Sequence, residues 1–378
     1  GPVGVTRLRW TYDAGAPLTS PAVMSDGTAV VGVSASSGQV LAVGVDGVKK
    51  WSVTGSGTAF ATAAPAIGQL AVWVGSDDGT LYAAELNGSG LKIGVGVNTG
   101  GVIEGSVAVL PGAGKEWAFA TSAAGFLGIA STVPGEYDIA APTTSFSAGP
   151  VIGLDGKVYA VTVSGSLRAY RLTTSPAVAL ADAWSTPVDV GGAVTAPMAI
   201  DAGGSVWAGT AVGALVKTIS SDASGTVTLV ATMSSWVVGS PVILTNGDVV
   251  VGDVSGILKR FSAAGVEAWS TNLGSAVEGP VVLAAGDAEL LVPAGGKLFA
   301  LGPDGSQIWS TALDTGSLRA ANIYTPPGQT GNVMSTAYLA SSSGKLFAVI
   351  VDGELDASAP WPKAFHDPRN TNRAGPQP

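Results

Sequence analysis

The chain has no cysteine among its 378 residues and only one histidine, His366. Without thiols, disulfide bridges, thiolate zinc sites and cysteine nucleophiles are excluded. Histidine is also the side chain most often used for acid–base catalysis near neutral pH. The absent thiols and the lone imidazole therefore favour a binding protein over an enzyme.

Charge is scarce as well. Only 12% of the residues are charged, the net charge is −9, and no stretch is strongly basic. Nucleic-acid binding needs clustered lysine and arginine to neutralise phosphates, so we expect no nucleic-acid partner. Anionic membrane surfaces are disfavoured for the same reason. No apolar run reaches 18 residues, so the sequence predicts no transmembrane helix.

The first residues carry no recognisable export signal. Gly1-Pro2 is typical of the remnant of a protease-cleaved expression tag, so we exclude it from the fold. Whether an export signal or a lipid anchor precedes this sequence is left open. We expect residues 1–6 to be a lead, residues 7–358 to form one domain, and residues 359–378 to be a tail that packs on the domain or is flexible.

Glycine and proline are abundant, with 54 and 22 residues spread between short apolar runs. Such spacing indicates many short strands joined by tight turns. One element, a small residue or proline followed by alternating apolar residues, recurs eight times at intervals of 39 to 47 residues. The mean interval of about 43 residues is typical of four-stranded propeller blades. The aligned positions are Pro21, Pro65, Ser106, Pro150, Pro197, Pro241, Pro280 and Ala321.

A second element keeps the same period. It is a glycine followed by an alternating apolar run, such as GSLRAY from Gly165 or GKLFAL from Gly296, and it too has eight copies. Asp-Gly and Asn-Gly pairs separate the runs and supply the positive φ angles that hairpin turns need. Alternation with period 2 predicts strands. The sequence therefore predicts an all-β fold, an eight-bladed propeller of four-stranded antiparallel blades.

The two ends of the chain predict how the ring closes. Residues 7–13, RLRWTYD, match the fourth-strand element IWSTALD at 308–314. No such element follows the last glycine run, which begins at Gly344. We therefore expect the N-terminal segment to supply the outer strand of blade 8, which removes an open sheet edge.

Two segments depart from the period. Residues 173–183 are predicted as an insertion between the third and fourth strands of blade 4, and residues 325–333 as an insertion between the first and second strands of blade 8. Loops on a rigid scaffold often carry binding sites. Tolerated sequence drift explains both segments equally well.

Several segments resemble pyrroloquinoline-quinone-type (PQQ-like) repeats, which build eight-bladed propellers. These segments are GSDDGTLYAAELNG (75–88), DGKVYAVTVSGSLRAY (155–170), GGKLFALGPDGSQIW (295–309) and LRWTYDAGAPLTSPAVMSDGTAVVG (8–32). The resemblance covers residues 7–353. These repeats indicate the fold well and the activity poorly.

Two functional branches share these repeats. Quinoprotein dehydrogenases bind the quinone with calcium or a lanthanide, and typically carry an adjacent cysteine pair, a catalytic aspartate and metal ligands on long inserted loops. This chain lacks the cysteines and the long insertions. The chain is more similar to the non-catalytic branch, which includes the propeller lipoprotein of the outer-membrane β-barrel assembly machine. No partner-binding motif of that branch can be matched residue by residue.

Candidate site residues lie where the first strand of each blade enters the channel. Two residues before the aligned positions stand Thr19, Glu104, Thr195, Glu278 and Arg319. We expect them near one channel mouth, with Glu104 and Glu278 opposite each other. They could form a polar ring that binds an ion or a polar ligand. The alternative is a Glu278–Arg319 ion pair beside a solvated Glu104.

Two other recurrent features have structural alternatives that we favour. The Asp-Gly pairs could be calcium loops, yet none has the dense acidic series that a hard cation needs, so we expect hairpin turns. The outer-strand tryptophans could stack on sugars, but their fixed place in the repeat favours packing between blades. They are Trp10, Trp51, Trp184, Trp269 and Trp309, and we expect Trp73, Trp117 and Trp207 on second strands to lie in the core.

The tail PWPKAFHDPRNTNRAG (360–375) differs from the repeats. It resembles a short element that often flanks repeats of this family. His366 beside Asp367 could suggest base catalysis, but no nucleophile can be assigned to the pair. The alternative that we favour is a staple across the blades, made by His366, Asp367, Arg369 and Asn370.

We therefore expect a non-catalytic scaffold or binding module of the bacterial cell envelope, periplasmic or associated with the outer membrane, or else extracellular. We expect a monomer that binds another envelope protein and needs no cofactor. The alternatives are a quinone-dependent dehydrogenase and a carbohydrate-binding propeller.

Overall fold

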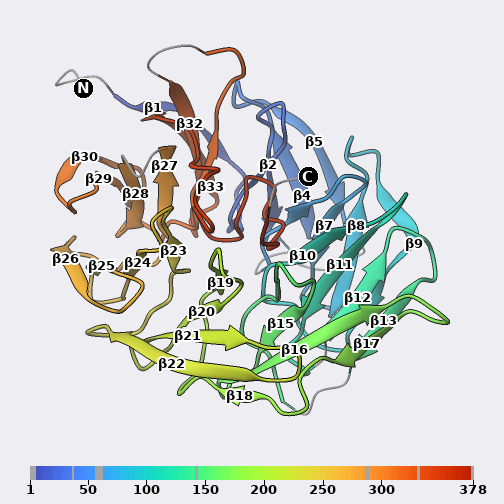
Figure 1. Ribbon diagram of the computed structural model, residues 1–378. Helices are drawn as coiled ribbons and strands as arrows, with labels where there is room; N and C mark the ends of the chain where they lie inside the picture. The colour runs from blue at the N-terminus through green and yellow to red at the C-terminus, as the bar shows by residue number, and fades with distance from the viewer. Residues whose placement is uncertain are drawn as a thin grey trace.

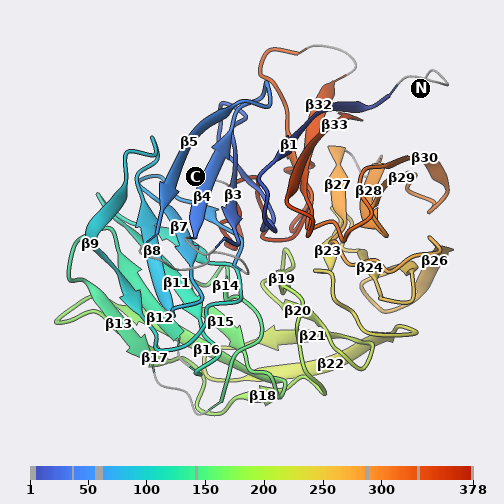
Figure 2. The same cartoon turned by 180° about the vertical axis from the view of Figure 1, so that it is seen from behind.

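The computed structural model describes residues 6–35, 38–55, 63–125, 127–140, 144–285, 289–329 and 333–375. Throughout this part of the chain the regular structure is β-strand, with no α-helix. The strands form eight separate sheets that stand around a central axis (Figures 1 and 2). The predicted all-β, eight-bladed propeller is confirmed. Nothing helical in the described ranges is long and apolar enough to cross a membrane.

Blades 1 to 4 follow the order of the chain, with the first strand innermost. Blade 1 contains β2 (Ala22–Val23), β3 (Ala29–Val33), β4 (Gln39–Val43) and β5 (Lys49–Thr54). Blade 2 contains β6 (Ala66–Ile67), β7 (Val72–Gly75), β8 (Thr80–Ala84) and β9 (Leu91–Asn98). Blade 3 contains β10 (Ala108–Pro111), β11 (Glu116–Thr121), β12 (Leu127–Ser131) and β13 (Tyr137–Ala140). Blade 4 contains β14 (Val151–Ile152), β15 (Val158–Val161), β16 (Ser166–Thr173), β17 (Ala179–Asp182) and β18 (Val188–Asp189).

Blades 5 to 8 repeat the arrangement and complete the ring. Blade 5 contains β19 (Ala199–Ile200), β20 (Val206–Gly209), β21 (Ala214–Ser220) and β22 (Gly225–Thr232). Blade 6 contains β23 (Val242–Ile243), β24 (Val249–Gly252), β25 (Ile257–Phe261) and β26 (Glu267–Asn272). Blade 7 contains β27 (Val282–Ala284), β28 (Glu289–Ala294), β29 (Lys297–Leu301) and β30 (Gln307–Ala312). Blade 8 contains β31 (Asn322–Tyr324), β32 (Met334–Ala340), β33 (Lys345–Asp352) and, from the other end of the chain, β1 (Leu8–Asp13).

The N-terminal strand closes the ring as predicted. β1 pairs antiparallel with β33 as the outer strand of blade 8, and both lie together in Figure 1. Trp10 on β1 reaches the next blade, where its Nε1 donates to the carbonyl of Val45 at 2.8 Å. Gly47 lies directly under the Trp10 ring, and any side chain there would collide with it. β1 therefore ties blade 8 to blade 1 by backbone pairing and by an aromatic contact.

The prediction that residues 173–183 are an insertion between the third and fourth strands of blade 4 is wrong. These residues hold the fourth strand of blade 4 itself, because β17 pairs with β16 from Tyr170↔Asp182 to Thr173↔Ala179. Trp184, expected on that strand, follows it and is buried at 3% exposure against Tyr159. A short extra strand, β18, then pairs with the start of β16. The irregular spacing in blade 4 thus comes from this second strand on the outer edge.

The other segment, 325–333, does join β31 to β32 as predicted, although residues 330–332 lie outside the described part of the chain. At its base, the side chain of Gln329 bonds both to the carbonyl and to the N–H of Met334. These bonds fix the start of β32.

The tryptophans occupy the two layers that the repeat predicted. Trp73, Trp117 and Trp207 are buried. On the outer strands, Trp51 packs over Gly88 of blade 2, and the Trp269 Nε1 donates to Pro303 of blade 7 at 2.8 Å. The predicted packing between blades is therefore confirmed for these residues. Trp51 and Trp269 are half-buried, each against the neighbouring blade.

A buried carboxylate links blade 2 to blade 3. Glu116 is 1% exposed. It accepts hydrogen bonds from the backbone N–H groups of Gln69 (2.7 Å) and Leu70 (3.1 Å) and from Trp73 Nε1 (2.9 Å). The turn between β6 and β7 therefore depends on an acceptor supplied by the neighbouring blade.

Replacing Glu116 by glutamine should lower the free energy of unfolding by about 2 kcal/mol, because the amide group turns a donor toward N–H groups that need an acceptor. Urea denaturation would measure this. Glutamine at exposed Glu104 is the control and should change stability little. Equal stability of the Glu116→Gln variant and the unaltered chain would show that the turn does not need the carboxylate.

Glu289, at the start of β28, is the group expected to give the fold a pH dependence. It is buried, at 6% exposure, and accepts a hydrogen bond from Trp309 Nε1 at 2.9 Å. Burial raises the pKa of Glu289 to about 7, the negative charge of Asp352 adds to the rise, and the Trp309 hydrogen bond and Arg7 oppose it. The folded chain therefore binds this proton more tightly than the unfolded chain does.

Because the folded pKa is raised, protonated Glu289 contributes stability that is complete below about pH 4.5 and is lost as the pH rises toward 7. Glutamine resembles the protonated acid. The Glu289→Gln variant should therefore lose less stability than the unaltered chain between pH 4.5 and pH 7.5. Chemical denaturation at closely spaced pH values measures the two slopes. Parallel slopes would assign the pH dependence to other groups.

Candidate functional site

The residues predicted at the channel mouth do line one cavity. Its volume is about 580 Å³, and all eight blades contribute to its wall. The link that leads into each first strand contributes to this wall, because every blade enters the channel in the same orientation. The wall includes all five predicted residues: Thr19, Glu104, Thr195, Glu278 and Arg319.

The charged residues of this cavity are not paired with one another. Glu104, Glu278 and Arg319 are all exposed. Within the described ranges, the alternative ion pair between Glu278 and Arg319 does not form, and neither glutamate has a hydrogen-bond partner. Arg319 instead uses its Nε to donate to the carbonyl of Leu18 at 3.3 Å. Both carboxylates are therefore available to a ligand.

Thr19 has a structural role at the same mouth. It is 2% exposed, and its hydroxyl accepts the backbone N–H of Gly32 at 2.8 Å. Thr195, by contrast, is exposed. The five predicted residues are therefore neighbours in space but differ in what they can offer to a ligand.

The C-terminal tail closes the floor of this cavity. Phe365 lines the cavity and packs with Ala64, Ala320 and Ala364. Because the tail blocks the channel, the cavity is a bowl that opens on one face of the ring. This bowl, called the channel-mouth bowl below, was only partly predictable, since no pattern in the repeats indicated what lies beneath it.

The tail itself runs along the inner strands and bonds to them in turn. In six blades a backbone N–H of the innermost strand donates to a tail carbonyl, at distances of 2.7 to 2.9 Å. The donor and acceptor pairs are Val23 to Pro368, Ile67 to Arg369, Val109 to Thr371, Ile152 to Asn372, Ile243 to Trp361 and Leu283 to Pro362. One segment therefore supplies partners that the innermost strands lack within their own sheets.

Two asparagines of the tail bind the repeated positions from which the blades were recognised. Asn370 donates to the carbonyls of Pro21 (3.1 Å) and Pro65 (3.2 Å). Asn372 donates to the hydroxyl of Ser106 at 2.7 Å. Both asparagines have positive φ angles, of 58° and 51°, a backbone conformation that persists only where its surroundings hold it.

The remaining predicted tail residues act mainly within the tail. Asp367 is buried and accepts hydrogen bonds from the N–H and the hydroxyl of Thr371. The ring of His366 lies 4.9 Å from that of Trp361, and its Nδ1 is 3.6 Å from Asp367 Oδ2. Arg369 binds blade 2 through its backbone carbonyl, as given above. The hydrogen bonds that cross between blades thus come from the asparagines and the tail backbone, and His366 takes no part in those described.

Sequence inspection did not single out Lys363, which is completely buried in the tail. Its ammonium donates to the carbonyls of Ala364 (2.6 Å) and Asp367 (3.0 Å) and to Asn370 Oδ1 (2.8 Å). Burial lowers the pKa of Lys363 to about 7, and the Asp367 carboxylate opposes the shift. Lys363 thereby fixes the orientation of the Asn370 amide that holds blades 1 and 2.

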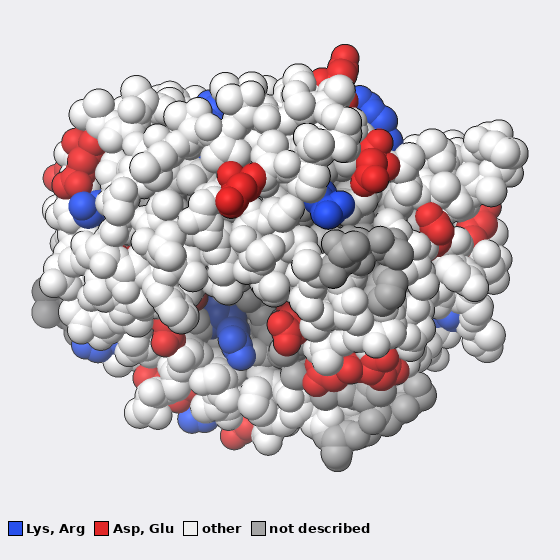
Figure 3. Space-filling view, turned by 90° about the horizontal axis from the view of Figure 1, so that it is seen from below, with Lys and Arg blue, Asp and Glu red and all other residues white. Residues whose placement is uncertain are grey.

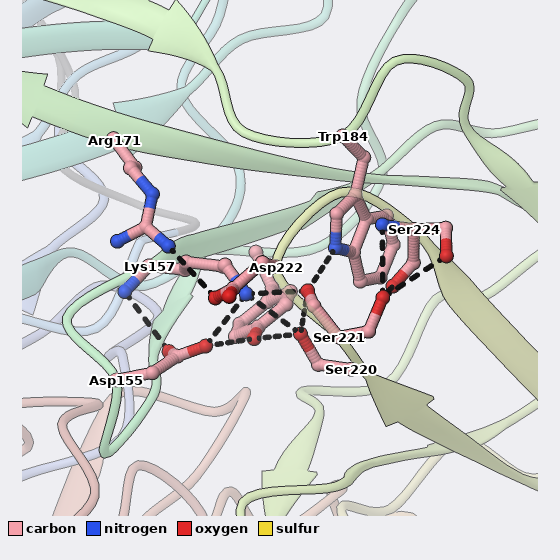
Figure 4. A network of polar contacts seen from close by, with 9 residues as sticks. Asp155, Lys157, Arg171, Trp184, Ser220, Ser221, Asp222 and Ser224 are labelled. Atoms are coloured by element: carbon pink, nitrogen blue, oxygen red, sulfur yellow. Dashed lines mark hydrogen bonds and ion pairs between the residues drawn. The ribbon is translucent and has the colours of Figure 1, made fainter.

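The other polar cluster that could suggest chemistry lies between blades 4 and 5 (Figure 4). Ser220 Oγ is 3.2 Å from Lys157 Nζ and 2.7 Å from the hydroxyl of Tyr159. A serine nucleophile needs a neutral base, but Lys157 forms an ion pair with Asp155 at 2.9 Å and donates to the carbonyl of Ser221 at 2.6 Å. Burial raises the pKa of Tyr159, which disfavours a phenolate base. We therefore interpret the cluster as a structural contact that holds blades 4 and 5 together.

The described residues do not fit a quinone–metal centre. Glu104 and Glu278 belong to blades on opposite sides of the ring. Among the residues placed in the structure, no three His, Cys, Asp or Glu side chains gather closely enough to hold a metal ion. Within the described residues, the bowl therefore offers carboxylates that stand on opposite sides of the ring.

Comparison with known proteins defines the class. Residues 176–370 match the family described as outer membrane protein assembly factor BamB. The match covers just over half of the chain, and the chain belongs to this family of PQQ-like repeat propellers. The resemblance inferred from the repeats is thus confirmed. No curated protein sequence matches the chain.

Solved structures show the same fold at low sequence identity. BamB from Moraxella catarrhalis is 15% identical, with 90% of this chain and 97% of that chain covered and a TM-score of 0.63. The computationally designed Ika8 protein is 16% identical, with 91% and 100% covered and a TM-score of 0.68. Saccharomyces cerevisiae Sqt1 is 11% identical, with 92% and 99% covered and a TM-score of 0.73.

Proposed function

We propose that this chain is a non-catalytic scaffold that binds another protein of the bacterial cell envelope. The observation that carries the proposal is the channel-mouth bowl, which is open on one face, closed below by the tail, and lined by unpaired charges from a rigid ring. A rigid face of this kind suits recognition of a macromolecule, since little order has to be gained on binding.

Family membership and surface charge support the proposal. The family is generally non-catalytic, and its name refers to the assembly of outer membrane proteins. We therefore infer a site of action in the periplasm or at the outer membrane, and a monomeric chain. On the side seen in Figure 3, acidic and basic side chains are scattered over a mostly uncharged surface, with no continuous basic patch for nucleic acid.

Two experiments test the proposal. The immobilised chain is incubated with solubilised envelope of the source organism, and a captured protein is purified and titrated against the chain; we expect a saturable complex. Separately, adding pyrroloquinoline quinone with calcium should leave the absorption spectrum of the quinone unshifted. A spectral shift that saturates with the quinone, without any saturable protein complex, would favour the dehydrogenase alternative.

A further inference from the structure

The turns between the second and third strands differ in one consistent way around the ring. In blades 2, 3, 7 and 8 the middle residues of this turn are Asp, Ala, Gly or Ser, whereas blades 4, 5 and 6 each carry a valine. These valines are Val163, Val212 and Val254. Turn residues of a propeller need no apolar side chain, so three in consecutive blades are a departure from the repeat.

Two of these valines are exposed, and the third, Val254, is half-buried. Val163 is 44% exposed and Val212 is 67% exposed. Trp236, in the link between blades 5 and 6, is 57% exposed, and its carbonyl accepts the N–H of Val254 at 3.0 Å. Trp236 and Val254 both line the bowl. We call Val163, Val212, Trp236 and Val254 the apolar arc.

The arc lies on the same face as the predicted charged residues. The turn from second to third strand and the link to the next blade meet at one end of every blade, as the Val254–Trp236 hydrogen bond shows. The face therefore has an apolar side over blades 4 to 6. Glu104 of blade 3 and Glu278 of blade 7 stand at the two ends of that side, and neither has a partner among the described residues.

We propose that this face binds a protruding segment of a partner protein that combines a basic side chain with large apolar residues. The basic group enters the bowl between Glu104 and Glu278, and the apolar residues cover the arc. Charge complementarity selects the basic group, since the bowl carries two carboxylates against the single guanidinium of Arg319, and neither carboxylate forms an ion pair within the described residues. This inference rests on the proposed function and adds to it the binding face and the chemistry of the partner.

The two halves of the face contribute differently. An exposed tryptophan is the type of residue that most often dominates a protein interface, so Trp236 and the valines should supply most of the affinity. Exposed carboxylates mainly steer association and fix orientation. The interaction should therefore be moderately weakened by salt and strongly weakened by loss of the arc.

The test uses a phage-displayed library of random 12-residue peptides selected on the whole chain. The selected peptides are then titrated by fluorescence anisotropy against three variants. The first carries Val163→Ser, Val212→Ser and Trp236→Ser, and the second carries Glu104→Gln and Glu278→Gln. The third is a matched control with Ile219→Ser on β21, Leu229→Ser on β22 and Val266→Ser in the turn before β26, which are exposed to similar degrees, 53%, 61% and 67%.

We expect selected peptides that contain arginine or lysine next to large apolar residues. Their affinity should fall at least about 30-fold in the arc variant and several-fold in the glutamine variant, with no change in the control. All substituted residues are exposed, so thermal melts should agree among the four proteins. Peptides without basic residues, or peptides that bind the arc variant as tightly as the unaltered chain, would overturn the inference.

The outcomes also separate this inference from the proposed function. If the purified envelope partner binds the unaltered chain and the arc variant equally, the scaffold function stands and this binding face is wrong. If no envelope protein forms a saturable complex, the scaffold function itself fails. Saturable binding of calcium alone that is lost in the glutamine variant would assign the two glutamates to a cation instead of a peptide.

Discussion

Deleting residues 7–13 is expected to open the ring and to lower the free energy of unfolding by about 5 kcal/mol, the sum of lost strand hydrogen bonds and lost burial of Trp10. The deletion leaves β33 as an unpaired edge and removes the contact between Trp10 and Val45 of blade 1. Exposed strand edges also promote association between molecules. Calorimetry should therefore show a large fall in the melting temperature, and light scattering should show larger particles.

A synthetic peptide of residues 6–14 provides the control for this deletion. Added in excess, it should pair with β33 and restore most of the lost stability, whereas the same peptide with Trp10→Ala should restore less. A deletion variant that melts at the temperature of the unaltered chain would show that β1 does not close the ring.

Replacing Lys363 by methionine is expected to cost about 3 to 5 kcal/mol, the usual result of removing one partner from a buried, hydrogen-bonded charge. The substitution removes the ammonium donor from Asn370 Oδ1 and from the carbonyls of Ala364 and Asp367. The Asp367 carbonyl keeps the N–H of Asn370 as a donor. It also removes a positive charge that helps to lower the pKa of the buried Asp367 carboxyl. Burial raises the pKa of Asp367, but the neighbouring His366 imidazole, the hydrogen bond from the Thr371 hydroxyl and the charge of Lys363 bring it below its ordinary value.

Because Asn370 holds Pro21 and Pro65, the loss should spread from the tail to blades 1 and 2. Hydrogen exchange measured by mass spectrometry should show faster exchange at Val23 and Ile67, whose N–H groups donate to the tail. Methionine at exposed Lys297 is the matched control and should have little effect. Unchanged exchange at the inner strands of the Lys363→Met variant would show that the tail does not depend on the ammonium.

The fold could be predicted from the sequence because the same sequence pattern recurs in each of the eight blades. Each copy of the proline element and of the glycine element supports the others, so a poorly matched copy such as Ala321 can still be aligned. The exception was blade 4. There, β17 follows an unusual link and β18 adds a second pairing with β16, and no repeat unit could predict an extra strand.

The site was predictable only where it follows the repeat. Glu104, Glu278 and Arg319 all stand two residues before an aligned position of the repeat, and all three line one cavity. They meet there because the blades share the same register. The contacts of the tail depend on inner strands from many parts of the chain meeting at the axis, which one sequence does not show. The apolar arc could have been found by comparing turn residues between blades, since its valines stand out against Asp, Ala, Gly and Ser.

The most direct test of protein binding at this face is photo-crosslinking in living cells of the source organism. A photoreactive amino acid is placed at Val212, in the apolar arc, and in a separate strain at Leu229, on the outer strand of blade 5. We predict a covalent adduct with another envelope protein from position 212 and none from position 229. The absence of any adduct from position 212, or the same adduct from both positions, would contradict protein binding through the channel-mouth face.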